Sequence, residues 1–302
     1  VQCLLAQVKG AFGDLESALK LAEKAVALDA QSARCRFVLA EVVGTIAARA
    51  SVFRQLGLAK RFKKEIDAAV ALNPKNLEAL DHLRLYYAMA PGIMGGDKSK
   101  ARGIAEQMGR IDASRGYLAQ ADLARREKQT DQVEKLYQKA VGADPRSYRA
   151  RMALANYYVG QKKLDLAAQQ AREAGTLDAG RAEAYGLLAA LCAEQKRYEE
   201  MEEVLVQAER QVPDNPAPHF RAGNALLGQG VELDRAERYF RKYLAQEPEA
   251  AGPLHAHAQW RLGLVLEKQG RKSEAVAALE TAVRLKPDLE PAKKDLKRLG
   301  RS

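Results

Sequence analysis

Small and apolar residues recur at helical spacing along most of this chain. The clearest copy is an expected helix pair at residues 148–159 and 164–177. One face of each helix carries such residues, namely Leu154, Ala155 and Tyr158 in the first and Ala167, Ala171 and Ala174 in the second. This spacing predicts two amphipathic helices, and the alanine methyl groups let helix axes approach closely. We expect Gly160 to take left-handed backbone angles in the turn between them.

A similar helix ending recurs along the sequence and sets its period. The endings are Asp29-Ala30, Asn73-Pro74, Asp112-Ala113, Asp144-Pro145, Asp178-Ala179, Val212-Pro213, Glu247-Pro248 and Lys286-Pro287. They are separated by 44, 39, 32, 34, 34, 35 and 39 residues. A period near 34 residues predicts stacked helix pairs and therefore an all-α solenoid, which is a binding surface more often than an enzyme.

The residues at fixed places in the later copies carry a family resemblance. In the last copy they are Leu262, Gly263, Leu266, Gln269, Gly270, Ala275, Leu279, Ala282 and Pro287. The chain resembles the tetratricopeptide repeat family over nearly its whole length, strongly in its second half and in degenerate form in its first. The resemblance implies a right-handed superhelix of about eight helix pairs that forms a single array. The expected repeats are 1–32, 33–76, 77–115, 116–147, 148–181, 182–215, 216–250 and 251–288, followed by a solvating cap helix within 289–302.

Three stretches lengthen the repeats. We expect about ten extra residues between the helices of the second repeat, within 44–64, and five extra residues in the loop 90–98 of the third. Both insertions would lie at one edge of the stack, and long loops in repeat proteins are often functional. Residues 249–253 fall between pairs and would bend the stack. The stretch 44–101 also resembles a subgroup of bacterial tetratricopeptide proteins whose members tend to be exported.

The first site that we expect is the concave groove, which the first helix of each pair lines in this family. The positions that face inward are Arg149, Met152, Asn156, Phe220, Arg221, Asn224, His257, Trp260, Arg261 and Lys268. Aromatic rings can anchor an apolar side chain, and arginines can hold carboxylates. Some family members grip a terminal carboxylate with lysine and asparagine. Here Asn156 and Asn224 match the asparagine, but Met152 and Phe220 stand in the place of the lysine.

The second expected site is basic. The chain has 49 Lys and Arg against 39 Asp and Glu, giving a net charge of +10. Cations gather at the expected insertion edge: Arg54, Lys60, Arg61, Lys63, Lys64, Lys98 and Lys100. Val52, Phe53 and Leu56 are interleaved with them, which suits an anionic partner or membrane surface. A solvated charged face is the simpler interpretation, with Asp97 or Ser99 as a helix N-cap.

Three cysteines cannot form a disulfide framework. A bridge between Cys3 and Cys35 is conceivable, but we expect both to be small buried hydrophobic residues. The chain starts at Val1 inside an apolar helical pattern, so we expect residues upstream, removed with a signal peptide or otherwise absent. An exported, periplasmic location is favoured by the resemblance, and a cytoplasmic one stays open.

No sequence motif of a catalytic, cofactor or metal site occurs, and a metal site built from His219, His255 and His257 is not expected. Aromatic residues make up 6% of the chain, which provides few platforms for stacking nucleic acid bases. We therefore predict a non-catalytic scaffold without a cofactor that binds a peptide or partner protein in its groove. The alternative is a carrier or sensor of an anionic lipid or apolar small molecule.

Overall fold

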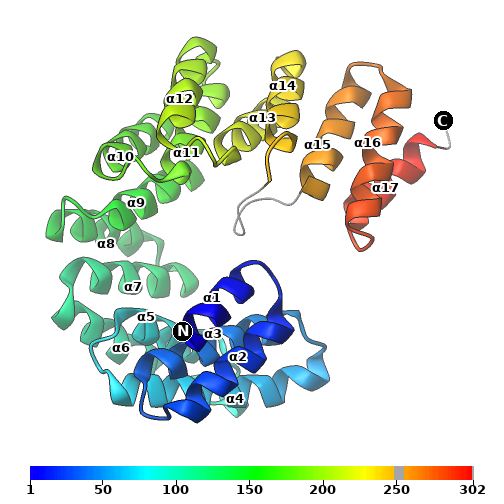
Figure 1. The fold of residues 1–302 in the computed structure, drawn as a ribbon. Helices are drawn as coiled ribbons and strands as arrows, with labels where there is room; N and C mark the ends of the chain where they lie inside the picture. The colour runs from blue at the N-terminus through cyan, green and yellow to red at the C-terminus, as the bar shows by residue number, and fades with distance from the viewer. Residues whose placement is uncertain (248–254, 301–302) are drawn as a thin grey trace. The chain divides into compact units, whose positions relative to one another are not determined.

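The computed structural model describes residues 1–247 and 255–300, which contain seventeen α-helices, one 3-10 helix and no strand. The chain divides into two compact units, residues 1–150 and residues 151–302. Within each unit, helices that are consecutive in the chain pack side by side as antiparallel neighbours (Figure 1). The architecture is thus an all-α solenoid of helix pairs. Among the described residues, the structure has no helix with the length and apolarity needed to cross a bilayer.

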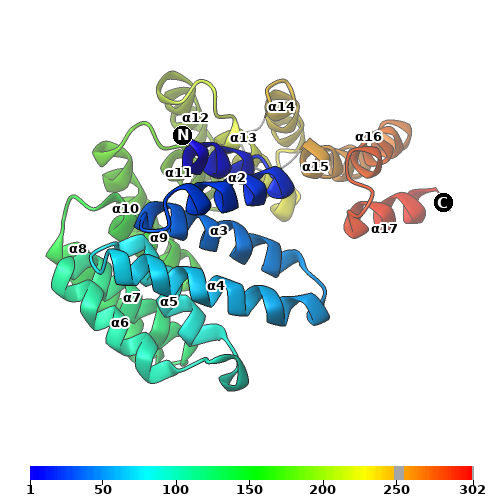
Figure 2. The ribbon, with the colours of Figure 1, turned by 60° about the horizontal axis from the view of Figure 1, so that its bottom comes forward.

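The N-terminal unit is built from eight α-helices and the start of a ninth, and Figure 2 shows α2 to α7 following one another. Their bounds are α1 Gln2–Ala11, α2 Leu15–Leu28, α3 Ala33–Arg49, α4 Val52–Leu72, α5 Leu77–Met89, η1 Gly92–Met94, α6 Lys98–Ile111, α7 Ala113–Arg126 and α8 Thr130–Ala143. Helix α9, Tyr148–Gly160, contains the boundary between the units.

The C-terminal unit continues the pattern with helices of 12 to 14 residues and a shorter last helix of 10. The helices are α10 Leu164–Leu177, α11 Ala182–Glu194, α12 Tyr198–Gln211, α13 Ala217–Gln229, α14 Leu233–Leu244, α15 His255–Lys268, α16 Lys272–Leu285 and α17 Glu290–Leu299. Helix α17 is the expected cap and packs on α16. Residues 249–253, which we expected to bend the stack, lie outside the described residues.

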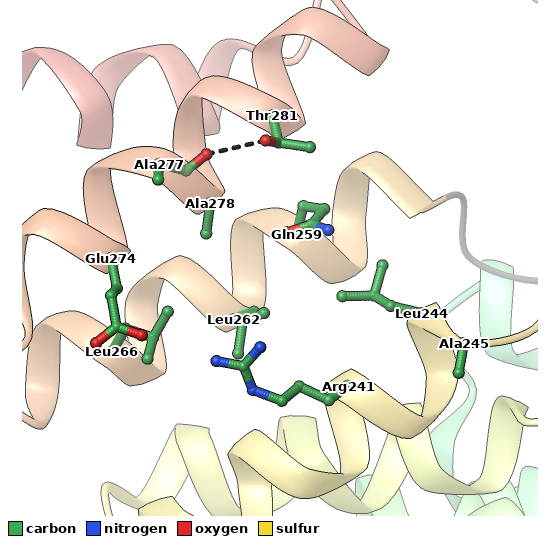
Figure 3. A pocket seen from close by; sticks show the side chains of 10 residues that line it. All are labelled: Arg241, Leu244, Ala245, Gln259, Leu262, Leu266, Glu274, Ala277, Ala278 and Thr281. Atoms are coloured by element: carbon green, nitrogen blue, oxygen red, sulfur yellow. Dashed lines mark hydrogen bonds between the residues drawn. The ribbon is translucent and has the colours of Figure 1, made fainter.

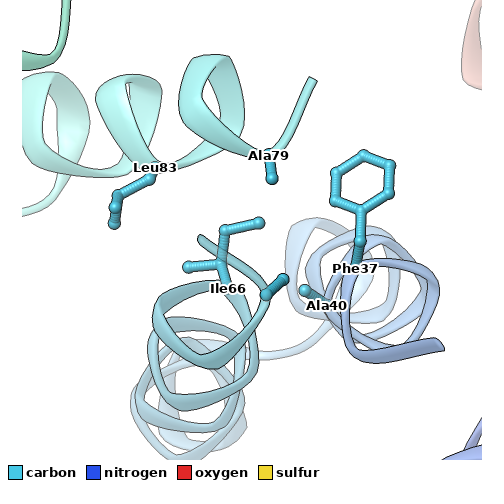
Figure 4. Packing of buried hydrophobic residues seen from close by; sticks show 6 residues of the cluster. Phe37, Ala40, Ile66, Ala79 and Leu83 are labelled. Carbon is cyan, nitrogen blue, oxygen red and sulfur yellow. The ribbon is translucent and has the colours of Figure 1, made fainter. Parts of the chain in front are cut away.

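Small side chains form the contacts between helices, as the spacing predicts. Ala167, Ala171 and Ala174 have no exposed surface, and Ala155 is equally buried. In the N-terminal unit, alanines alternate with larger residues where α3, α4 and α5 meet (Figure 4). There Ile66 of α4 lies between Phe37 of α3 and Leu83 of α5. This close approach of the axes builds a core without large side chains at every position.

The expected endings close their helices. Seven of them provide the C-cap residue of a second helix: Asp29, Asn73, Asp112, Asp144, Asp178, Val212 and Lys286. Some helices, among them α2, α3 and α5, begin at a side chain that accepts a backbone N–H bond. At the start of α6, Asp97 accepts bonds from the backbone N–H groups of Ser99 and Lys100 at 2.9 and 3.1 Å. Such a cap is worth about 1 kcal/mol to a helix. The Asp97 cap that we anticipated is therefore present.

The extra residues of the second repeat do not form a loop, so that expectation was wrong. They lengthen both helices, because α3 has 17 residues, α4 has 21, and only Ala50 and Ser51 separate them. The stretch contains no proline and is rich in Ala, Arg, Leu and Lys, which all favour helix. In the third repeat Pro91 and Gly95 stop the helix, and a loop with the single turn η1 forms as expected.

The left-handed turn position was misplaced by two residues. Gly160 is the last residue of α9, and Lys162 takes the positive φ of 57°. Lys128 and Lys196 take φ of 60° and 57° at the corresponding places, whereas Gly230 does so in the seventh pair. A side chain with a Cβ costs about 1–2 kcal/mol in this conformation. Glu232, with a φ of 48°, is a fourth such residue, so four turns among the described residues carry local strain.

The cysteine expectation also fails in part. Cys3 of α1 and Cys35 of α3 form a disulfide, with Cα atoms 5.5 Å apart, and join the first helices of the first two pairs. Helix α1 packs on α3 as well as on α2, which brings the two residues into range. Cys192 is a free, buried cysteine, and burial raises the pKa of its thiol.

Candidate functional site: a basic hollow on first helices

A hollow of about 950 Å³ opens in the C-terminal unit between α13, α15 and α17. Its lining consists of Asn224, Leu227, Gly228, Arg261, Leu264, Glu267, Lys268 and Arg298. Three of the expected groove residues, Asn224, Arg261 and Lys268, therefore lie at one place. The helical repeat explains this, because Arg261 and Lys268 are two turns apart on α15 and Leu264 lies between them on the same face.

Some charged side chains of the hollow form ion pairs and others do not. Arg298 of the cap helix is held by Glu267, with one contact of 2.7 Å between Nη2 and Oε2, and by Asp295 at 3.1 Å. The bond from Arg298 lowers the pKa of Glu267, so this carboxylate is ionised and already paired. Arg261 and Lys268, by contrast, have no ion-pair partner among the described residues. The hollow thus presents two available cations.

The surroundings fix where these two cations lie. The Arg261 guanidinium stacks on the Trp260 ring, 4.1 Å from its centroid, and burial lowers the pKa of Arg261 without discharging it. The Lys268 ammonium reaches across to α13 and lies 3.8 Å from the position that a Cβ on Gly230 would occupy. Gly230 is the C-cap of α13, where the helix dipole favours a positive charge.

Trp260 was expected as a free anchor in the groove, and the structure corrects this. Its indole N–H donates to Asp295 Oδ2 of α17 at 2.8 Å. Its ring packs against the cluster of Ala256, Ala282, Leu289 and Ala292 that joins α15 and α16 to the cap. Trp260 therefore holds the cap helix and supports Arg261 from behind, instead of contacting a ligand in the hollow.

Phe220 is also misplaced by the expectation. It is buried, with ring centroids 5.7 Å from Phe240 and 5.1 Å from Tyr243, so it belongs to the core between α13 and α14. On α13, Phe220 lies at the border between the face that packs in the core and the face that lines the groove. Its ring points toward the core. Neither Phe220 nor Trp260 lines the hollow.

The other expected groove residues lie in varied surroundings. Arg149 and Arg221 are exposed, and the Arg221 stem lies over Gly186 of α11. Asn156 is exposed and donates to the backbone oxygen of Met152 at 2.8 Å, while the Met152 side chain is buried. His257 is half-buried, and burial lowers the pKa of its imidazole. None of these lines the hollow.

A second hollow, of about 470 Å³, lies between α14, α15 and α16 (Figure 3). Its floor is apolar, with Leu244 and Leu262, and Arg241 and Glu274 provide its charges. Both charges are already paired, because Arg241 binds Glu237 at 2.8 Å and Glu274 binds Arg271 at 2.6 Å. This hollow offers less to a charged ligand than the first one does.

The cations of the expected edge divide into two groups. Arg61 bonds to Glu23 at 2.5 Å, Lys63 pairs with Asp67, and Lys100 lies 3.7 Å from Asp97. The ammonium groups of Lys63 and Lys100 also lie over the Tyr87 ring. The remaining four have no ion-pair partner among the described residues: Arg54, Lys60, Lys64 and Lys98.

Titratable groups that could support catalysis are few in the described part of the chain. No group of three or more His, Cys, Asp or Glu side chains there is placed to hold a metal ion. His219 is buried, its Nε2 lies 3.0 Å from Glu209 Oε1, and burial is the main cause of its lowered pKa. The Tyr239 ring packs against His219, Glu209 is exposed, and neither member of the pair lines the hollow.

Sequence reasoning missed the contribution of the cap helix. Arg298 lines the hollow from the cap helix, where no site residue was expected. The other lining residues that were not expected lie on the first helices α13 and α15: Leu227, Gly228, Leu264 and Glu267. The signal was available in part, because Leu264 shares the helical face of Arg261 and Lys268. The bidentate pairing of Arg298 with Glu267, 31 residues apart, depends on tertiary packing and has no local signature.

Comparisons with known proteins agree with this architecture. The sequence profile of the tetratricopeptide repeat family matches residues 118–180 and 220–290, and no curated protein sequence matches the chain. The crystal structure of yeast Tom70 is similar with a TM-score of 0.57 at 14% identity, over 99% of this chain and 80% of Tom70. A human IFIT1 dimer with PPP-AAAA is similar with a TM-score of 0.57 at 19% identity, over 95% of this chain and 68% of IFIT1. Residues 118–180 and 220–290 therefore match tetratricopeptide repeats, and the seventeen helices of the described residues stack in the manner of such repeats.

Proposed function

We propose that this protein is a non-catalytic scaffold that binds a peptide or a segment of a partner protein. The partner would lie along first helices of the C-terminal unit and place an acidic group in the hollow. The observation that carries the proposal is the pair of available cations, Arg261 and Lys268, beside the Asn224 amide in an open hollow. An amide and two cations suit a carboxylate, which accepts several hydrogen bonds at once.

The energetics favour a few strong contacts over a large area. Charge-assisted hydrogen bonds contribute about 1.5–3 kcal/mol each, and Leu227 and Leu264 add an apolar wall that excludes water. Two such contacts with modest apolar burial fit micromolar binding, roughly −8 kcal/mol. Because Arg261 is supported by Trp260, the guanidinium is positioned before the ligand arrives, which lowers the entropic cost of binding.

The test uses acidic ten-residue peptides, with the best binder selected from a library on the full chain and labelled for fluorescence polarisation. Arg261→Ala with Lys268→Ala is expected to weaken binding about a hundredfold, because two charge-assisted contacts are lost. The matched control is Lys272→Ala with Arg284→Ala, which removes the same two charges from exposed positions on α16. This control is expected to change the affinity less than threefold.

Unchanged affinity in the Arg261 and Lys268 variant, or an equal loss in the control, would refute the hollow as the site. Trp260 is left unaltered because its loss would loosen the cap helix. A weaker affinity in a Trp260 variant could then come from lost folding of the cap as well as from a lost contact with the peptide.

A different anion is an outcome of the same test. The likeness to IFIT1 with PPP-AAAA suggests PPP-AAAA as a second probe. The eight lining residues include no aromatic ring to stack a base, so we expect the acidic peptide to bind more tightly. Tighter binding of PPP-AAAA would favour a nucleic acid partner instead.

The disulfide supports an oxidising compartment for this chain, since such bonds form and persist outside the reducing cytosol. This agrees with the exported location that the family resemblance suggested. The alternative function, binding of an anionic lipid, draws its support from the other unit and is developed next.

A further inference from the structure

The first turns of α4 from residue 53 onward do not pack against the hydrophobic core. Residues 53–57 are all exposed, with the Phe53 side chain 97% exposed and Leu56 44% exposed. Helices in proteins are stabilised mainly by burying an apolar face. A large aromatic ring that is held almost entirely in solvent on such a helix gains nothing from the rest of the chain. Exposed apolar side chains that gather at one place mark an interaction surface, and Phe53 and Leu56 both lie at this end of α4.

The charge of this segment has one sign. Residues 42–64 contain six basic residues and no acidic residue. Phe53, Lys60 and Lys64 lie at i, i+7 and i+11, which places them along one face of α4. Lys60 and Lys64 have no ion-pair partner among the described residues, whereas Arg61 on another face pairs with Glu23. The face thus carries an apolar tip followed by two available cations.

The neighbouring loop repeats this composition. Ile93 in η1 is 94% exposed, Met89 at the end of α5 is 64% exposed, and Lys98 begins α6. The loop is attached to the same edge, because η1 lies against α4 and the Tyr86 hydroxyl donates to the backbone oxygen of Met94. The Tyr86 ring in turn stacks on Phe62 of α4, with centroids 5.7 Å apart.

We propose that this edge, the start of α4 together with η1, binds the surface of an anionic membrane. Phe53 and Ile93 enter the interface between headgroups and acyl chains, and Arg54, Lys60, Lys64 and Lys98 contact lipid phosphates. Exposed apolar side chains flanked by cations without acidic neighbours have the charge and polarity that this interface requires. A second copy of the chain would bring the same cations face to face, so repulsion disfavours a dimer through this edge.

The test is co-sedimentation of the full chain with vesicles of phosphatidylglycerol and phosphatidylcholine in equal parts, compared with phosphatidylcholine alone. The wild type is expected to bind the anionic vesicles and to dissociate as salt rises. Lys60→Glu with Lys64→Glu is expected to reduce the partition coefficient at least about thirtyfold. Phe53→Ser with Ile93→Ser is expected to reduce it roughly tenfold or more, because apolar insertion is lost.

Matched controls lie on α2, at the end of α4 and in the turn that follows α4. Lys24→Glu with Lys75→Glu reverses two exposed charges, and Leu28→Ser with Leu72→Ser removes two exposed apolar side chains. Both are expected to bind like the wild type. Equal binding to neutral vesicles, equal losses in the controls, or full binding by the Lys60 and Lys64 variant would each overturn the proposal. So would a concentration-dependent dimer that Phe53→Ser abolishes, since a second copy would then cover the edge.

Discussion

The two units of this protein are built from the same kind of helix pair but differ in helix length and in which residues they expose. In the C-terminal unit, α10 to α16 have 12 to 14 residues each, and the polar features gather in a hollow on first helices. In the N-terminal unit, α3 and α4 grow to 17 and 21 residues, a proline-glycine loop follows, and apolar side chains are exposed at their ends. In the regular C-terminal unit the candidate binding surface is the hollow on the first helices, whereas in the N-terminal unit it is the exposed end of the lengthened helix pair.

The difference shows that added residues do not have one structural outcome. Between α3 and α4 the added sequence continues the helical propensity of its neighbours, so the helices extend beyond the layer that buries them. Between α5 and α6, Pro91 and Gly95 end the helix and make a compact loop. Both additions lie in the N-terminal unit, and together they form the edge that we propose as its binding surface.

The largest effect is expected from the disulfide, which only the N-terminal unit has among the described residues. Cys3→Ala with Cys35→Ala should destabilise α1 and α2 by about 3 kcal/mol, because the bridge closes a loop with a sequence separation of 32. Hydrogen exchange of the full chain should show faster exchange in α1 to α3 and little change in α15 and α16. Chemical reduction of the wild type should reproduce the effect. If reduction leaves exchange in α1 unchanged, the bridge does not stabilise the pair.

Acidification is expected to have a smaller effect on stability, and this effect should fall on the C-terminal unit instead of the N-terminal unit. Burial and the nearby Lys242 ammonium lower the pKa of His219 below its ordinary value of 6.5, against the raising effect of Glu209. Between 6.5 and the lowered value the unfolded chain binds more protons, so stability falls as the pH decreases through this window. The protection factors of amides in α12 to α14, which are exchange rates corrected for the intrinsic effect of pH, should therefore fall from pH 7.5 to 5.5, and His219→Gln should remove this part of the fall.

The N-terminal unit provides the contrast to that prediction. Burial raises the pKa of Asp122, but bonds from Arg126, Arg125 and Arg84 outweigh it, and the pKa lies below 3.8. Its contribution to stability is complete above 3.8 and is lost as the pH falls through the lowered value. The Asp122 contribution around α5 and α7 should thus persist at pH 5.5. Protection factors that fall equally in both regions, with and without His219→Gln, would contradict the assignment to His219.

The smallest effect concerns the strained turns. Lys162→Gly should stabilise the C-terminal unit by about 0.5–1 kcal/mol, because relief of left-handed strain exceeds the entropy cost of glycine. The mirror variant Gly230→Lys, at a φ of 70°, should destabilise by about 1 kcal/mol. Chemical denaturation of both variants tests the pair, and a destabilised Lys162→Gly would contradict the expected sign.

Periodicity predicted the helix pairs because small residues at helical spacing report packing directly, as Ala167 and Ala171 illustrate. It could not separate core from groove on α13, where Phe220 turned inward, since both faces take apolar residues. The helix propensity of residues 44–64 agrees with the long helices α3 and α4, whereas the excess over the usual repeat length indicated a loop. The pairing of Trp260 with Asp295 and of Cys3 with Cys35 depends on residues more than thirty positions apart, which no local pattern encodes.

The most direct test of the central claim, that each unit carries its own binding surface, is a crossed binding experiment on the full chain. The selected acidic peptide and the anionic vesicles are each titrated against both charge variants. The account predicts that Arg261→Ala with Lys268→Ala loses the peptide and keeps the vesicles, whereas Lys60→Glu with Lys64→Glu does the reverse. If both variants weaken both ligands to the same degree, binding follows the net charge of +10, and separate sites are contradicted.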